Sequence, residues 1–359
     1  MKSLEPEPTL KTRLNSHRCV LALLLLGAAF GSWAAEARLE VITFTSRALE
    51  ANPLHDPATR SVAVFIPAQA TNGARLPIVY YLPGFGNSSA RFISNSAPWL
   101  HWTQLSADAG TPVLFVVVDG RNRWGGSQYL NSPAQGNYAD YICDEVVAQV
   151  EARHPAPTNG VRRVIAGHSS GGFGALRLGM ARPKLFDAVV ALSPDSDFPI
   201  SHLPPAKAPD IAKVPLADIE KQAKGEAPVP KDGELNYHLA LSAAYAPRRD
   251  SKSGEFDWLY DAHGQFREEV WQRWLDNDPL TLVKKNPLAF ATNQMLYLEG
   301  AAQDEYSANI GARKINVALS NHPGRHVFYE PSGHHSDGVP ERLQRGLNWV
   351  FEKPLTDLK

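Results

Sequence analysis

Residues 164–174 read VIAGHSSGGFG, an apolar segment followed by Gly-x-Ser-x-Gly and then by more small residues. The apolar part is typical of a buried strand, and the small residues after it are typical of the start of a closely packed helix. A sharp turn between the two would hold Ser169 in a strained conformation and lift its hydroxyl above the sheet. Gly167 and Gly171 fit this turn because a side chain at either position would collide with the neighbouring strand or helix. The stretch therefore predicts that Ser169 is a nucleophile.

The local sequence leaves two alternatives open. Ser170 is a second candidate nucleophile, although it lies outside the Gly-x-Ser-x-Gly frame, and the glycines could form a turn that only packs. In the favoured interpretation the backbone N–H of Ser170, at the start of the helix, points at the oxyanion that develops when a carbonyl is attacked. We expect His168 to shape the turn rather than to transfer protons.

Outward from this stretch, short apolar runs alternate with helical patterns. Most of the runs are continuously apolar, which is typical of strands buried on both faces of a parallel sheet. The predicted strands are residues 38–45, 61–67, 76–83, 113–119, 163–167, 188–193, 294–299 and 326–329. The predicted helices are residues 138–153, 172–182, 308–320 and 340–351. This order predicts an α/β fold with a mostly parallel central sheet and helices on both faces.

One long interval, between the strands at 188–193 and 294–299, breaks the alternation. Residues 199–230 are rich in Pro, Lys and Ala and predict a loop-rich excursion, whereas residues 256–275 carry several large aromatic side chains. We interpret the region around residues 199–290 as a cap-like insertion over the sheet edge. An ordinary covering helix with a surface loop explains the composition equally well.

A serine hydroxyl is a poor nucleophile without a base, and the base needs an acid to orient it. The Gly-x-Ser-x-Gly turn resembles that of the α/β-hydrolases, in which the acid and then the histidine follow the serine along the chain. Asp304 follows the predicted strand at 294–299, and His335 follows the strand at 326–329. Both would lie at the carboxyl edge of the sheet, where open α/β sheets place their sites. We therefore expect Asp304 and His335 to complete a triad.

Each of these assignments has rivals. Asp195 and Asp197 follow the strand at 188–193, and Asp195, after a proline, could instead cap a turn. Glu305 adjoins Asp304 but would point elsewhere, and His334 competes with His335. The two adjacent histidines also suggest a metal site, but no Asp, Glu or Cys cluster with ligand spacing accompanies them. We therefore expect neither metal nor cofactor.

A second oxyanion donor is expected from the loop after an early strand. Residues 80–87 read YYLPGFGN, and the two glycines of this loop would let the backbone approach a substrate carbonyl closely. The backbone N–H of Phe85 is our candidate. A plain tight turn is the alternative.

Composition excludes several classes of function. The chain has 359 residues with 36 Lys+Arg against 37 Asp+Glu, a formal net charge of -1, so it lacks the basic excess of a nucleic-acid-binding protein. Hydrophobic residues make up 43% and charged residues 20%, which is ordinary for a globular protein and wrong for a disordered one.

The N-terminus has the three-part pattern of a secretory signal peptide. Four basic residues precede an apolar run at 19–30, and small residues follow at 32–35. The run is short for a bilayer span, which takes about 20 residues, although a membrane anchor is the alternative. We expect residues 1–34 to be a signal peptide, so the mature chain would be secreted or periplasmic, without a stable membrane span. Its single cysteine, Cys143, could form no internal disulfide, and we expect a buried, inert thiol there.

Together these motifs resemble the putative-esterase family, which includes S-formylglutathione hydrolase, feruloyl and acetylxylan esterases, siderophore esterases and secreted mycolyltransferases. The resemblance extends from about residue 38 to residue 351. It implies an α/β-hydrolase fold over residues 35–359, and the family's Gly-x-His-Ser ending favours His335 over His334. The matching segments are residues 82–86, 131–142, 167–172, 300–306 and 333–336.

The resemblance implies a serine esterase that cleaves a small-molecule or carbohydrate-linked ester through Ser169, His335 and Asp304, with no nucleic-acid partner. Many members have His-Gly or Asp-Gly where this chain has Pro83-Gly84, and the signal peptide argues against a cytosolic S-formylglutathione role. An acyltransferase with the same triad is a second interpretation. A non-catalytic binding protein on the same scaffold is a third, but it would need no complete triad.

Overall fold

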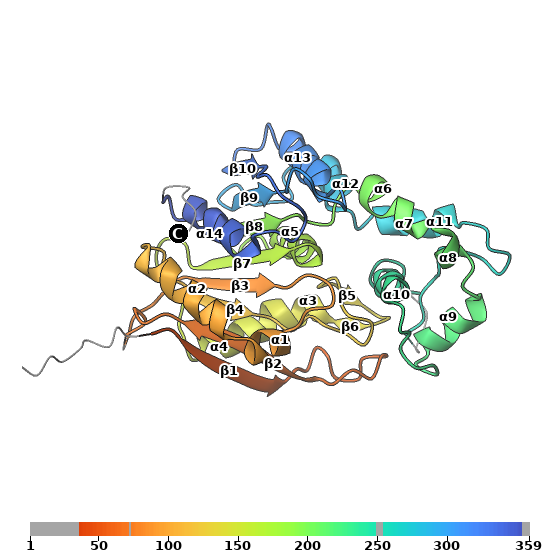
Figure 1. Ribbon diagram of the computed structural model, residues 1–359, viewed down its shortest axis with the longest axis horizontal. Helices are drawn as coiled ribbons and strands as arrows, with labels where there is room; N and C mark the ends of the chain where they lie inside the picture. The colour runs from red at the N-terminus through yellow and green to blue at the C-terminus, as the bar shows by residue number, and fades with distance from the viewer. Residues whose placement is uncertain (1–35, 72, 249–253, 354–359) are drawn as a thin grey trace, which may run out of the picture. The chain divides into compact units, whose positions relative to one another are not determined.

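An eight-stranded sheet forms the centre of the computed structural model, with the strand order β1-β2-β4-β3-β7-β8-β9-β10 (Figure 1). The structure describes residues 36–71, 73–248 and 254–353. β1 pairs with β2, and β2 with β4, in the antiparallel sense, whereas all other neighbouring strands are parallel. The expected mostly parallel α/β sheet is therefore confirmed.

Each strand of this sheet lies within two residues of the bounds expected from the sequence. In β3, β4 and β8 every residue is buried, because helices cover both faces of the sheet. The strands are Arg38–Thr45 (β1), Thr59–Ile66 (β2), Ile78–Leu82 (β3), Leu114–Val117 (β4), Arg163–His168 (β7), Ala188–Leu192 (β8), Met295–Glu299 (β9) and His326–Tyr329 (β10). A separate two-stranded sheet pairs Asn131–Ser132 (β5) with Gly136–Asn137 (β6).

Two layers of helices enclose the sheet. Three helices pack on one face, contributing Phe92, Trp102 and Leu343 to that core; they are Ser89–Ser94 (α1), Ala97–Asp108 (α2) and Val339–Val350 (α14). The other face is covered by Tyr138–Asp140 (α3), a π-helical turn at Tyr141–Val146, Val147–Glu151 (α4), Ser170–Ala181 (α5), Pro279–Lys285 (α12) and Ala308–Ala318 (α13). The helices expected at 138–153, 172–182, 308–320 and 340–351 are all present, the first with a π-helical turn; α1 and α2 were not expected.

Between β8 and β9, short helices make up most of residues 199–230, so the expectation of a loop-rich stretch there was wrong. Prolines near the first turn are compatible with a helix because the N–H they lack would have no partner there. The helices are Phe198–Ser201 (α6), Leu203–Ala206 (α7), Pro209–Ala212 (α8), Leu216–Ala223 (α9), Gly233–Tyr245 (α10) and Glu268–Leu275 (α11). They share a second core with Trp258 and Trp274, and α8 to α11 lie beyond the carboxyl ends of the parallel strands (Figure 1).

The proposed signal peptide, residues 1–34, lies outside the described residues. In the described part of the chain, no helix has the length and apolar character needed to cross a membrane. Cys143 is buried in the π-helical turn, and burial raises the pKa of its thiol to about 12. The thiol is therefore protonated and unreactive at neutral pH, as the sequence predicted.

Candidate active site

Ser169 lies on a tight turn between β7 and α5. Its backbone has φ 58° and ψ −125°, a strained conformation for a residue with a side chain. The turn needs glycine on both sides of the serine. A Cβ on Gly167 would lie 2.1 Å from the carbonyl oxygen of Gly171, and a Cβ on Gly171 would lie 1.8 Å from that of Leu82. The structure thus forms the elbow that the sequence predicted, and the serine is exposed to a cavity at the carboxyl edge of the sheet.

The loop after β3 lies directly against this turn. A Cβ on Gly84 would be 3.4 Å from the Cβ of Ser169, so the backbone of the loop passes beside the serine. The ring of Phe85 packs on Gly125 and against Tyr237, with 4.9 Å between the two ring centroids. Among the described residues, the amides of Phe85 and Ser170 donate no hydrogen bond to a backbone carbonyl. Both N–H groups are therefore available to a bound ligand.

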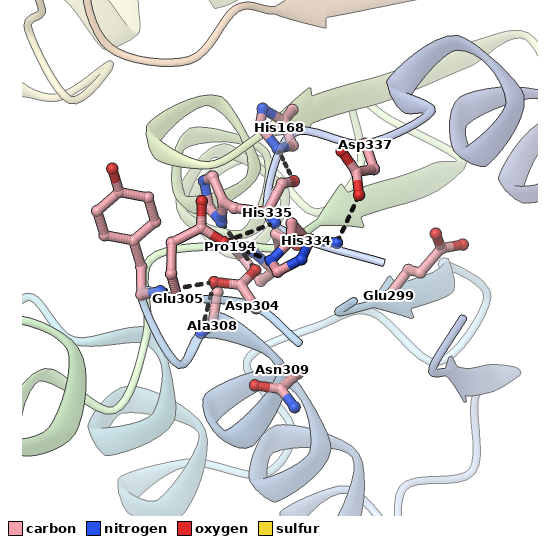
Figure 2. A network of polar contacts seen from close by, with 12 residues as sticks. His168, Pro194, Glu299, Asp304, Glu305, Ala308, Asn309, His334, His335 and Asp337 are labelled. Carbon is pink, nitrogen blue, oxygen red and sulfur yellow. Dashed lines mark hydrogen bonds and ion pairs between the residues drawn. The ribbon is translucent and has the colours of Figure 1, made fainter. Parts of the chain in front are cut away.

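His335 and Asp304, which follow the adjacent strands β10 and β9, form a hydrogen bond of 2.8 Å between Nδ1 and Oδ2 (Figure 2). Oδ1 of Asp304 accepts the backbone N–H groups of Tyr306, at 3.0 Å, and Ala308, at 3.4 Å. Burial raises the pKa of Asp304, but the hydrogen bond and charge of His335, with the other donors, outweigh this and lower its pKa. The carboxylate is therefore ionised at neutral pH and holds Nδ1 of His335 protonated.

Main-chain hydrogen bonds fix the position of His335. Its N–H donates to Glu305 at 3.0 Å, and its carbonyl oxygen accepts from Nε2 of His168 at 2.8 Å (Figure 2). Burial lowers the pKa of His168 to about 3, so this ring is neutral and its proton lies on Nε2. His168 therefore anchors the loop of His335, a different structural role from the shaping of the turn that the sequence led us to expect. The side chain of His334 is 67% exposed and faces Glu305.

A buried arginine adds a further clamp that the sequence analysis missed. Arg342 of α14 donates from Nη1 to the carbonyl oxygen of His335 at 2.8 Å and from Nη2 to Ser193 at 2.7 Å. Its Nε donates to the fully buried carboxylate of Glu299 at 2.8 Å. The hydroxyl of Ser193 in turn helps lower the pKa of Asp304. The spacing of Arg342 and Arg345 on the buried side of a helix was the one sequence signal for this cluster.

The site opens into a cavity of about 450 Å³. Ser169 and His335 line it together with Gly84, Phe85 and residues of α6, α7 and α10. The region between β8 and β9 therefore supplies part of the wall. Among the described residues, no cluster of His, Cys, Asp or Glu has the arrangement of a metal site.

The structure separates the rival acids. Asp195 lines the cavity, but its Oδ2 accepts the hydroxyl of Ser170 at 2.9 Å, and its hydrogen-bond partners do not include His335. Asp197 pairs with Lys314 at 2.5 Å, and Glu305 binds the main chain of His335 rather than its ring. Of the candidate acids, Asp304 is the one that contacts the imidazole.

With this geometry established, comparisons with known proteins identify the family. The model of a family described as putative esterase matches residues 57–340. The chain belongs to this family. It is 29% identical over 149 residues to the S-formylglutathione hydrolase of Mus musculus, an alignment that covers 37% of this chain and half of the mouse protein. The esterase family expected from the motifs is thus confirmed.

Solved structures show the same fold. A ferulic acid esterase is similar with a TM-score of 0.56 at 16% identity, covering 88% of this chain and 98% of its own. An S-formylglutathione hydrolase from Agrobacterium tumefaciens has the same TM-score and identity, covering 89% of this chain and 96% of its own. These similarities confirm the α/β-hydrolase fold.

Proposed function

We propose that the protein is a secreted or periplasmic serine esterase that hydrolyses a carboxylic ester through Ser169, His335 and Asp304. The hydrogen bond of 2.8 Å between His335 and Asp304, beside a strained serine in the same cavity, carries the proposal. The basic, apolar and small-residue segments of residues 1–34 support export.

The reaction would proceed through an acyl-enzyme. Nε2 of His335 accepts the proton of Ser169 while its oxygen attacks the ester carbonyl, and Asp304 stabilises the imidazolium that forms. The imidazolium then gives its proton to the departing alcohol, which leaves the acyl group on Ser169. Water attacks this second ester with His335 again as the base, so the acid is released and the serine is restored.

The negative charge that develops on the carbonyl oxygen would be bound by the N–H groups of Phe85 and Ser170. The Ser170 amide is the first of α5, a twelve-residue helix whose N-terminus carries partial positive charge. The position of Gly84 against Ser169 supports the Phe85 assignment, because it places the loop within reach of a carbonyl at the serine. N–H donors that are already oriented stabilise this charge more than water does, because water must reorganise around it.

Hydrolysis of p-nitrophenyl butyrate and labelling by a fluorophosphonate test the proposal. Ser169→Ala should lower turnover by roughly 10⁴- to 10⁶-fold and abolish labelling, whereas Ser170→Ala keeps its backbone N–H and should retain most activity. Loss in Ser170→Ala with activity kept in Ser169→Ala would move the nucleophile by one residue.

The same assay separates the alternative functions. An acyltransferase would divert acyl groups to an added alcohol acceptor in preference to water. A wild-type protein that neither hydrolyses esters nor reacts with the fluorophosphonate would be a binding protein on this scaffold.

A further inference from the structure

A buried carboxylate lies beside the proposed nucleophile and takes no part in the triad. Asp195 is 7% exposed and lines the cavity. Its Oδ2 accepts the hydroxyl of Ser170 at 2.9 Å and that of Tyr237 at 3.2 Å, which leaves Oδ1 without a hydrogen-bond donor among the described residues. Because Ser170 adjoins Ser169, this carboxylate is close to the place where a substrate carbonyl would sit.

The cavity supplies no cation to balance that charge. Its lining contains the two acidic residues Asp195 and Glu234 and neither lysine nor arginine. A buried carboxylate that is taken out of water without a cationic partner is costly, and the cost falls when a partner binds. A cationic ligand would therefore supply the partner that Asp195 lacks.

A histidine in the same wall adds no positive charge to the cavity. His202 lines the cavity and is 4% exposed. The Ser201 hydroxyl lies 2.9 Å from Nδ1 of His202 and 3.0 Å from the carbonyl oxygen of Ser196, and it forms a hydrogen bond with each. Nε2 of His202 is enclosed by the surrounding atoms and has no hydrogen-bond partner in the described part of the chain, so a ligand in the cavity does not reach it. Burial lowers the pKa of His202 to about 4, so the ring stays neutral and does not balance the charge of a neighbouring carboxylate.

We propose that the cavity binds esters that carry a protonated amine near the scissile carbonyl, with Asp195 as the counter-ion. The inference rests on the proposed esterase function. An ammonium group is the ligand that answers the unpaired carboxylate, since it brings positive charge and N–H donors at once. The aromatic rings of Phe85, Tyr237 and Tyr306 in the lining add surfaces that favour a cation.

Four ethyl esters with the same two-carbon spacer test the charge preference: β-alanine ethyl ester, ethyl butyrate, ethyl 3-hydroxypropanoate and monoethyl succinate. They differ only in a terminal ammonium, methyl, hydroxyl or carboxylate group. We expect kcat/KM, measured by ethanol release near neutral pH, to favour the ammonium ester over the methyl ester by roughly 10- to 100-fold, the value of one charge-assisted hydrogen bond. The carboxylate ester should be the poorest.

The alcohol side is tested in parallel. 3-Aminopropyl butyrate and butyl butyrate have the same length and differ in a terminal ammonium or methyl group, so a preference for the aminopropyl ester would place the amine on the leaving group. A cationic preference in neither pair overturns the inference, and so does a hydroxyl ester that is as good as the ammonium ester.

Asp195→Asn assigns the preference to this carboxylate. The variant should lose about tenfold or more of the ammonium-to-methyl ratio, whatever happens to its absolute rate. Asp197→Asn, the same change two residues away at a side chain paired with Lys314 outside the cavity lining, should leave the ratio unchanged. An unaltered ratio in Asp195→Asn would overturn the assignment.

Binding separates this inference from the proposed function. If the wild-type protein hydrolyses none of the esters, the esterase proposal fails, but calorimetry still measures the affinity of the Ser169→Ala variant for β-alanine ethyl ester. Tighter binding than for ethyl butyrate, lost when Asp195→Asn is added, supports the cationic site. Equal affinities overturn it.

Discussion

Replacing Asp304 by asparagine should disable the enzyme without unfolding it, because the surroundings dictate how the new amide is oriented. Oδ1 of Asp304 accepts two backbone N–H groups, from Tyr306 and Ala308, while Oδ2 faces Nδ1 of His335. An asparagine oxygen must occupy the Oδ1 position to satisfy those two donors. Its NH₂ group then faces Nδ1 of His335 and donates to it.

That reversal changes the tautomer of the imidazole. A ring that accepts at Nδ1 carries its proton on Nε2, so it cannot take the proton of Ser169. The imidazolium also loses its counter-charge. The expected cost is on the order of 10³- to 10⁴-fold in kcat/KM, or about 4 to 5.5 kcal/mol in the activation free energy.

The assay is p-nitrophenyl butyrate hydrolysis, with circular dichroism and thermal melting as checks that the fold persists. Asp197→Asn is the matched control because it is equally isosteric and follows the neighbouring strand β8, but its carboxylate pairs with Lys314. The reasoning fails if Asp304→Asn keeps more than about a tenth of the activity while Asp197→Asn loses it.

Three further predictions follow from the surroundings of His335. His335→Ala should abolish hydrolysis, whereas His334→Ala, at an exposed side chain, should cost little; steady-state rates of the two variants decide, and the reverse order would move the base to His334. Arg342→Gln removes the hydrogen bond to the His335 carbonyl, so it should lower kcat more than it changes KM and shift the acidic limb of the kcat/KM pH profile. Arg342→Lys should restore part of the activity. An unchanged pH profile would mean that Arg342 has only a structural role. Burial lowers the pKa of His168 to about 3. Below about pH 6.5 this histidine is therefore protonated in the unfolded chain but not in the folded protein, so the free energy of unfolding falls as the pH drops toward 3. His168→Gln should flatten the decline of Tm over that range, and an equally steep decline would contradict this account.

Local backbone requirements made the elbow predictable from the sequence. A Cβ at Gly167 or Gly171 would lie less than 3 Å from adjacent backbone atoms, so both positions require glycine. This requirement is visible in the sequence as glycines at fixed offsets from Ser169. Asp304 and His335 were also predictable, because each directly follows an apolar strand and the carboxyl ends of parallel strands meet at one edge. The three residues of the proposed triad thus lie in short segments that the sheet topology brings to one edge.

The partners of those residues depend on tertiary structure. Arg342 reaches His335, Glu299 and Ser193 from the last helix, and Tyr237 and His202 meet Asp195 only after the chain between β8 and β9 has packed on the sheet edge. No local pattern encodes such contacts, since each side chain is compatible with a solvent-facing position until a distant segment buries it. The sequence by itself therefore determined the fold class and the residues that we propose to react. Long-range packing decided how His335 is held and what charge the cavity offers to a substrate.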